Sequence, residues 1–532
     1  MLDTKKTSVA SAALILMISN IISRIIGCVR VILIPNKLGT DFVGDAFNVA
    51  FLVPDLMYNL LLGGALAAAL IPVLSGYVEQ KEEKEGWQVV GTFMNVMFLA
   101  MATFSLIGLF FTPQILPLVA DNFLKQSTET RELAIELTRI LFPSVSFLML
   151  AGLCNGVLNS YHKFKAAAFG PIIYNIGCIS SLYFLGASNY DGAVKVAYGF
   201  MASSFIYFLF QFFSAIRKLK YYRPKIFLFK PGFIKMLKLA IPSLISSTVY
   251  QLNIIVLARY VTYTAIGGMT LFNTANRTWQ LPLGIFAQSM GVAVLPALSA
   301  KFTVNNTEGY RKLLIQGLKS ILFFSVPSAF AFAVISQPIV RALFKLTNNF
   351  SEQDVGRMSE ILMFFSAALI AQSIVLITIR AFYAAKNTLI PLIIGASTIF
   401  VNGILGYIFL NHTSLGVSGM AFAYSISSAF HALGLIIILN SKICKIVDKD
   451  IVKFFIKIIF SSTVMAMGLL LIKEYLPVNI ESKTNQILNL LILVITGTGI
   501  FFLMTHILKV EEVKSFINKA LKRLKKQKQN GE

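Results

Sequence analysis

Two arginines interrupt a run of apolar residues near the start of the chain. The run extends from Val9 to Ile34 and contains Arg24 and Arg30. An arginine near the centre of a membrane-spanning helix costs at least about 3 kcal/mol, so a compensating interaction is needed. Its planar guanidinium binds two oxygens at once, which suits phosphate better than the ammonium of lysine does. The pair therefore indicates an anion site, with phosphate as the favoured ligand.

The two arginines can border one wide cavity from a single helix. Ser23 and Arg30 share a helical face, whereas Arg24 is rotated by about 120° from Arg30 and lies about 9 Å from it along the axis. Gly27 between them removes a side chain where the helix can bend or a ligand can approach. We expect this helix to form one wall of a polar cavity.

Two further apolar segments carry polar stripes. In the segment centred near residue 60, the stripe lies within an arc of about 80°; its members are Asp45, Asn48, Asp55 and Asn59. In the segment centred near residue 284, the arc is about 120°; its members are Asn273, Asn276, Arg277, Gln280, Gly284, Gln288 and Gly291. Such stripes must face another helix or water, because lipid cannot satisfy them.

The charges of these polar surfaces do not balance. Ion pairs of Arg24 or Arg30 with Asp45 or Asp55 are one interpretation for single residues. With Arg277, however, there are three arginines against two aspartates, and an unpaired buried cation is costly. We therefore predict a net-positive, water-filled cavity in which the three arginines bind an anion and Asp45 is their gating charge partner. Weaker cavity candidates are Ser23, Asn48, Asp55, Asn59, Asn276 and Gln280.

Composition indicates that membrane-spanning helices position these residues. The 532 residues are 56% hydrophobic and 13% charged, and their mean hydropathy is +0.74. A spanning helix needs about 20 apolar residues. About fourteen such segments are present, centred approximately at residues 22, 60, 101, 147, 177, 205, 247, 284, 327, 370, 398, 428, 463 and 497. The chain is predicted to be an all-α polytopic membrane protein.

Basic residues indicate the orientation of these spans. The formal net charge is +23, and positive residues gather in alternate loops; examples are Lys5 and Lys6, 217–230, 442–453 and 522–528. The positive-inside rule then places both termini in the cytoplasm, which requires an even number of spans and favours fourteen. Attraction to anionic membrane lipid explains the basic tail better than nucleic-acid binding does.

An internal similarity suggests two related halves. Residues 158–177 and 379–398 both read aromatic, basic, short turn and then proline before the next apolar run; chance similarity is the alternative. We predict two pseudo-symmetric six-helix lobes plus two helices. The predicted parts are 1–215 (first lobe), 216–234 (cytoplasmic linker), 235–445 (second lobe), 446–508 (added helices) and 509–532 (basic tail).

No pattern of catalytic or metal-binding residues stands out. The four cysteines and four histidines are dispersed, and they form no CxxC pair or metal-ligand spacing. We expect no catalytic residue, no metal site, no cofactor and no cleavable signal peptide. Asn253 and Asn402 are candidate ligands of a cation, and such a cation or the membrane potential is the expected energy source for conformational change.

Five sequence blocks resemble the MurJ lipid II flippases of the multidrug/oligosaccharidyl-lipid/polysaccharide exporter superfamily. The blocks include SNIISRIIGCVRVILIPNKLG (19–39) and ANRTWQLPLGIFAQSMGVAVLPALS (275–299). The others are 44–77, 155–171 and 380–391. Together they extend over most of the chain through the twelfth predicted span.

The resemblance implies a function and a set of site residues. It implies fourteen helices that move an undecaprenyl-diphosphate-linked peptidoglycan precursor from the inner to the outer leaflet of the bacterial cytoplasmic membrane, by alternating access. Expected partners are this lipid, membrane lipids and cell-wall synthesis proteins. The family's cavity arginines match Arg24, Arg30 and Arg277, and its acid matches Asp45. Neutral residues replace frequent family charges at Val31, Tyr58, Asn59, Gly63, Asn276 and Gln280.

Three alternatives remain open at this point. The first is an exporter of another polyprenyl-linked glycan. The second is an ion-coupled drug exporter of the same superfamily, although an arginine-lined cavity would repel cationic drugs. The third is a membrane glycosyltransferase or ligase acting on polyprenyl-linked sugars, although the outer loops are short and poor in paired carboxylates.

Overall fold

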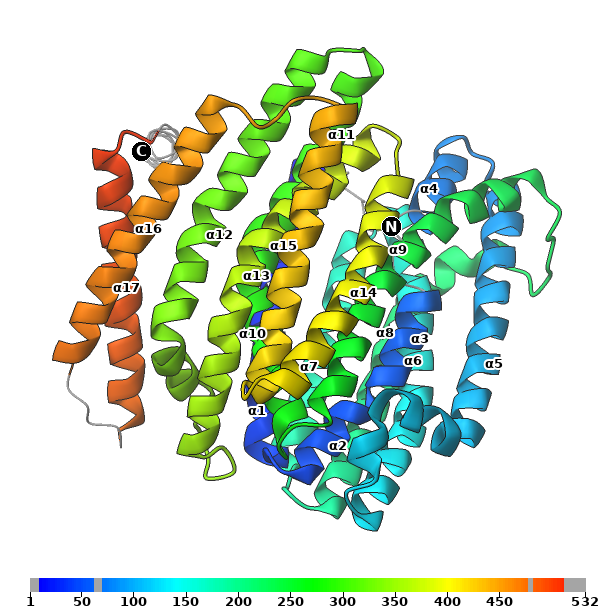
Figure 1. Ribbon diagram of the computed structural model, residues 1–532. Helices are drawn as coiled ribbons and strands as arrows, with labels where there is room; N and C mark the ends of the chain where they lie inside the picture. Colours follow the sequence, from blue (N-terminus) through cyan, green and yellow to red (C-terminus); the bar gives the residue numbers. More distant parts are fainter. Residues whose placement is uncertain (1–8, 62–68, 477–481, 511–532) are drawn as a thin grey trace, which may run out of the picture. The chain divides into compact units, whose positions relative to one another are not determined.

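The computed structural model describes residues 9–61, 69–476 and 482–510. All regular structure in this part of the chain is helical (Figure 1). The predicted all-α polytopic class is confirmed, because 11 helices in that part are long and apolar enough to cross a membrane. They are α5 (Glu83–Leu124), α6 (Thr128–Ser160), α7 (Phe164–Leu185), α8 (Tyr190–Ala215) with the turn η2 (Ile216–Tyr221), α9 (Pro231–Val261), α12 (Thr307–Phe344), α13 (Glu352–Ala384), α14 (Leu389–His412), α15 (Gly416–Lys442), α16 (Lys449–Tyr475) and α17 (Lys483–Ile507).

The other three expected spans fall on helices outside this set, so the number fourteen stays a prediction. The first is α1 (Val9–Leu38). The second is divided; its described helices are α2 (Phe42–Ala50), α3 (Leu52–Leu61) and α4 (Ile71–Glu79). The third consists of α10 (Gly268–Pro282), the π-helical turn η3 (Leu283–Gln288) and α11 (Ser289–Thr303). Pro282 has no N–H to donate, which weakens the regular helix where the π-helical turn begins.

The chain forms two compact units. Unit one contains residues 1–274 and 347–350, and unit two contains 275–346 and 351–532. The helix α9 packs on α3 and α5, so it belongs to unit one. The unit boundary therefore lies within α10, whereas the predicted lobe boundary was the linker 216–234. The predicted division into lobes and added helices stays a prediction.

In unit one, large apolar side chains of α3, α4, α5, α6 and α9 form a shared core. Trp87, which begins the apolar part of α5, is fully buried there. Its indole N–H donates to the Tyr161 hydroxyl at 3.0 Å, and that hydroxyl donates to Glu83 at 3.1 Å. The polar ends of these aromatic side chains are thus satisfied where α5 begins and α6 ends.

Polar residues mark the beginnings of several helices. In each case a side-chain oxygen accepts a hydrogen bond from an otherwise unpaired backbone N–H of the first turn. The capping residues are Asp41 for α2, Ser127 for α6, Asn189 for α8, Asn306 for α12, Ser351 for α13 and Asp448 for α16.

In unit two, α12 is the helix against which α13, α16 and α17 pack. Aromatic rings hold part of this contact: the Phe323 ring of α12 lies 5.3 Å from the ring of Phe501 and 5.9 Å from that of Phe502, both on α17. The two last helices are therefore joined to unit two through α12.

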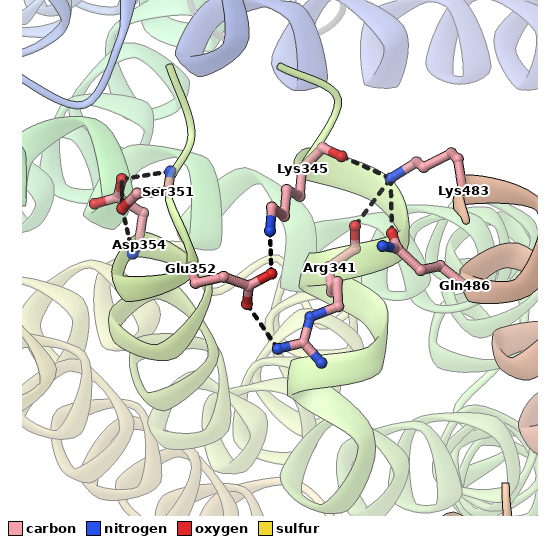
Figure 2. Close-up of polar contacts among 7 residues, drawn as sticks. All are labelled: Arg341, Lys345, Ser351, Glu352, Asp354, Lys483 and Gln486. Carbon is pink, nitrogen blue, oxygen red and sulfur yellow. Dashed lines mark hydrogen bonds and ion pairs between the residues drawn. The ribbon is translucent and has the colours of Figure 1, made fainter. Parts of the chain in front are cut away.

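A polar cluster fastens the beginning of α17 to the end of α12 (Figure 2). The Lys483 ammonium donates to the carbonyl oxygens of Arg341 at 2.9 Å and of Lys345 at 3.0 Å. Glu352, at the beginning of α13, pairs with the side chains of Arg341 and Lys345. We call these four residues the α17 clamp. The lysine supplies positive charge and donors to carbonyls that a helix end leaves unpaired.

Replacing Lys483 with methionine is expected to lower the stability of the protein by about 1–2 kcal/mol, because charge-assisted bonds to two carbonyls are lost. The measurement is the midpoint of thermal unfolding of the purified protein. Lys442→Met removes one positive charge from an exposed position and serves as the control. Equal midpoints for the two variants would show that the clamp contributes nothing to stability.

Candidate functional site

Arg30 lies on the side of α1 that packs against α7. Its guanidinium carbon is 5.5 Å from the centroid of the Tyr174 ring, in a cation–π contact. The Tyr174 ring in turn lies 6.3 Å from the ring of Tyr207 on α8. The carboxylate of Asp55, on α3, also interacts electrostatically with Arg30. Within unit one, an aromatic face and a carboxylate thus compensate this cation of the first predicted span.

The other predicted residues of α1 share the intermediate exposure of Arg30. Ser23 and Arg24 are half-buried. The helix continues without a break through Gly27. A Cβ built at Gly27 would lie 3.8 Å from the amide nitrogen of Asn175 on α7, so the glycine lies at the α1–α7 contact.

Asp45 binds the beginning of α10. The side chain is buried, with 4% of its surface exposed. One carboxylate oxygen accepts the Gly267 N–H at 2.8 Å. The other accepts the Thr270 N–H at 2.8 Å and the Thr270 hydroxyl at 2.9 Å. A carboxylate is stabilised at this position, because a helix N-terminus presents unpaired N–H groups and partial positive charge.

The contact between α2 and α10 continues one turn further along both helices. Asn48 donates to the Thr270 hydroxyl at 3.3 Å, and its side-chain oxygen accepts from Asn273 at 3.3 Å. Two glycines permit the close approach. A Cβ at Gly44 would lie 2.9 Å from the Thr270 hydroxyl oxygen, and Gly267 has a φ of +80°, which favours glycine. The first two residues of the predicted second-span stripe, Asp45 and Asn48, therefore face another helix.

In the second half of that stripe, Asn59 contacts α9 through its backbone. Asn59 donates to the backbone oxygen of Asp55 at 2.8 Å, within α3. The hydroxyl of Ser247, on α9, donates to the backbone oxygen of Asn59 at 3.1 Å. Asp55 and Asn59 are both half-buried, so the stripe combines helix contacts with partial exposure.

In unit two, neighbouring polar residues of α10 have different surroundings. Arg277 is exposed, whereas Asn276 is buried. The Asn276 side-chain oxygen accepts hydrogen bonds from Trp279 and Gln280, both at 3.0 Å. The Trp279 ring stacks on that of Phe365, with 5.9 Å between ring centroids. Asn276 thus orients the tryptophan that packs α10 against α13, while the side chain of Arg277 is exposed.

The structure assigns partners that the sequence did not indicate. Tyr174, Gly267 and Thr270 contact the predicted residues Arg30 and Asp45 from distant parts of the chain. The Gly-Gly pair before the α10 stripe was the available signal for a close helix approach. The gating role of Asp45 and the anion-binding role of the arginines stay predictions. Gly63 lies outside the described residues.

Comparison with known proteins links this arrangement to one family. A family model described as "Lipid II flippase MurJ" matches residues 34–487. The "Probable lipid II flippase MurJ" of Rickettsia prowazekii is 28% identical over 505 residues, which are 94% of this chain and 97% of that protein. "Lipid II flippase MurJ" of Burkholderia cenocepacia is 25% identical over 451 residues, which are 84% of this chain and 86% of that protein.

Solved structures give the same result at the level of the fold. "Lipid II flippase MurJ, inward closed conformation" matches with a TM-score of 0.76 and 26% identity, covering 93% of this chain and 98% of that one. An inward-facing multidrug resistance MATE family transporter matches with a TM-score of 0.69, covering 81% of this chain and 98% of that one. The identity to the MATE transporter is 17%, so this second match bears on the fold alone.

Replacing Asp45 with asparagine is expected to destabilise the protein by about 2–4 kcal/mol, since the charge is lost and an amide replaces a buried carboxylate that accepts three hydrogen bonds. The measurement is thermal unfolding of the purified protein. Asp191→Asn, at an exposed position in the first turn of α8, is the control. An Asp45→Asn variant as stable as this control would contradict the importance of the α2–α10 contact.

Proposed function

The chain belongs to the MurJ family of lipid II flippases, and from this premise we propose how its own residues handle the lipid. Lipid II is the undecaprenyl-diphosphate-linked peptidoglycan precursor, and the protein translocates it from the inner to the outer leaflet for cell-wall synthesis. We propose that Arg24, Arg30 and Arg277 bind the diphosphate while the lipid tail stays in the bilayer. The observation that carries this assignment is the excess of arginine over acid in the polar surfaces, three against two.

The chemistry of the substrate matches these side chains. A diphosphate presents several anionic oxygens, and each guanidinium can bind two of them. In the absence of the anion, like charges within one cavity repel one another and favour an open state. Binding of the diphosphate removes this repulsion and lets the cavity close over the head group, so the ligand shifts the population of states. No covalent step is needed, and the protein acts as a transporter and not as an enzyme.

Asp45 is proposed to take part in gating through α10. Its carboxylate lies at the beginning of the helix that continues to Arg277. When the arginines lose their anion, Asp45 is the acid proposed to hold or release one of them. Its three hydrogen bonds to α10 support a link between that carboxylate and the arginine-bearing helix.

The energy source of the cycle is proposed to be the membrane potential or a cation. Asn253 and Asn402 are the proposed cation ligands, and both are buried. Asn253 also donates to the backbone oxygen of Val249 at 3.1 Å, within its own helix. Its side-chain oxygen is the atom suited to a hard cation.

Replacing Arg24, Arg30 or Arg277 with alanine is expected to abolish complementation of bacteria depleted of their own lipid II flippase. The physical reason is the loss of a cation that binds the diphosphate. The measurement is growth at matched protein levels. Arg131→Ala removes the same charge from an exposed position near the beginning of α6 and should complement fully. Full complementation by the Arg24 and Arg30 variants would refute the assignment.

Native mass spectrometry of the protein extracted with its lipids tests the substrate itself. A co-purifying undecaprenyl diphosphate that carries the peptidoglycan precursor is the expected result. A different polyprenyl-linked glycan would redirect the proposal to another exporter of the same superfamily.

The protein is a multi-pass membrane protein, and we propose that both termini lie in the cytoplasm of the bacterial cell. A fluorescent protein fused to the C-terminus is expected to fluoresce, and alkaline phosphatase fused there is expected to be inactive. Insertion of each reporter between α14 and α15, after Ser414, should give the opposite pattern. Phosphatase activity at the C-terminus would overturn the proposed orientation.

A further inference from the structure

The segment between η2 and α9 is bound to the side of α5. We call residues 222–230, Tyr222 to Lys230, the strap; Figure 1 shows it as a loop beside α5. Asn95 of α5 donates to the backbone oxygens of Arg223 at 3.2 Å and Lys225 at 3.0 Å. The Thr92 hydroxyl accepts the Phe227 N–H at 3.1 Å. Buried polar groups of α5 thus bind the backbone of the strap, and the side chains at its two ends, Tyr222 and Lys230, donate to Asn95 and Gln88 of α5.

Four consecutive apolar side chains of the strap are exposed. The exposed fractions are 43% for Ile226, 37% for Phe227, 48% for Leu228 and 92% for Phe229. An exposed run of large apolar residues marks a surface that contacts a protein or a membrane. Because the strap backbone is already bonded to α5, little further ordering is needed when these side chains are covered.

Basic residues surround this apolar run. Arg223, Lys225 and Lys230 lie within the strap, and the preceding turn η2 contains Arg217, Lys218 and Lys220. No acidic residue occurs between Asp191 and Glu308 in the sequence. This stretch of the chain therefore carries positive charges only and suits a negatively charged partner, and apolar residues flanked by lysine and arginine are the combination that binds anionic membrane interfaces.

The position of the strap along α5 favours lipid as that partner. The first turn of α5 is charged, with Glu83, Lys84 and Glu85. Asn95 follows Glu85 by ten residues, which is about 15 Å of helix. The strap therefore lies beside the beginning of the apolar part of a membrane-spanning helix, at the depth where head groups meet acyl chains.

We propose that the strap is an interfacial membrane anchor. Phe229 and its apolar neighbours insert among acyl chains, and the exposed side chains of Arg223 and Lys225 bind the head groups of anionic phospholipids. On the proposed orientation of the chain, this is the cytoplasmic leaflet. Because the strap leads directly into α9 and is bonded to α5, the anchor connects the lipid composition of that leaflet to two helices of unit one.

The test uses a fluorescent label at a cysteine that replaces Phe229, in the full chain reconstituted into vesicles. Cys28→Ser removes the one native cysteine that is not buried. The matched control is a label at Lys84→Cys, an exposed position on α5 closer to its charged end. Vesicles contain phosphatidylethanolamine and phosphatidylglycerol at three to one or phosphatidylcholine alone, each with a brominated-lipid series to quench the label from within the bilayer.

The label at position 229 is expected to be quenched by brominated lipid at least about threefold more than the label at position 84, and less by aqueous iodide. Equal iodide quenching at the two positions would overturn the anchor, and would leave a protein partner as the interpretation of the exposed run.

A second variant tests the role of charge separately. Arg223→Gln with Lys225→Gln keeps both backbone carbonyls that Asn95 binds. The label at position 229 is expected to lie deeper in vesicles with phosphatidylglycerol, and these two substitutions are expected to reduce that difference by at least about half. Quenching that is independent of lipid charge in both proteins would overturn the anionic-lipid part of the proposal. Flippase activity is not the readout, so failure of the anchor and failure of the transport assignment are distinguishable.

Discussion

The hydrogen bonds between the Asp45 carboxylate and the first N–H groups of α10 are the interaction on which the polar interior of unit one depends. They stabilise a buried charge, because the helix terminus supplies N–H donors and partial positive charge. They also fix the position of α10 along α2. As a result, Asn48, one turn after Asp45, lies beside Thr270 and Asn273. A glycine on each side, Gly44 and Gly267, is what lets the two backbones approach.

The sequence was sufficient to predict the class of structure and the family. Apolar run lengths predicted a helical, polytopic protein, since backbone groups in lipid must be satisfied within each segment. The number of spans is harder to predict where polar stripes and prolines interrupt the helix. The second and eighth expected spans are divided into shorter helices around Phe51 and Pro282, so length and hydropathy do not define them as single units.

The partners of the site residues could not be predicted for a different reason. A charge count includes only side chains, so it could not show that the N–H groups of Gly267 and Thr270 donate to the Asp45 carboxylate. Arg30 lies against Tyr174, whose position depends on how α7 packs on α1. Asn276 belongs to a polar stripe of the sequence, yet its side-chain oxygen accepts a hydrogen bond from Trp279 of the same helix and orients that ring. Periodicity gives the face of a helix but not the residues that meet it.

The α17 clamp has a consequence for the biosynthesis of the protein. Lys483 follows Arg341 by 142 residues in the chain, so α12 is made well before its lysine partner exists. While the ribosome produces the four helices in between, the last carbonyls of α12 must rely on water or head groups. The final helix therefore completes an earlier one as well as adding its own span. In a nascent chain that stalls before Lys483, the carbonyl oxygens of Arg341 and Lys345 lack their lysine donor. Quality-control proteases can recognise such an incompletely packed unit two.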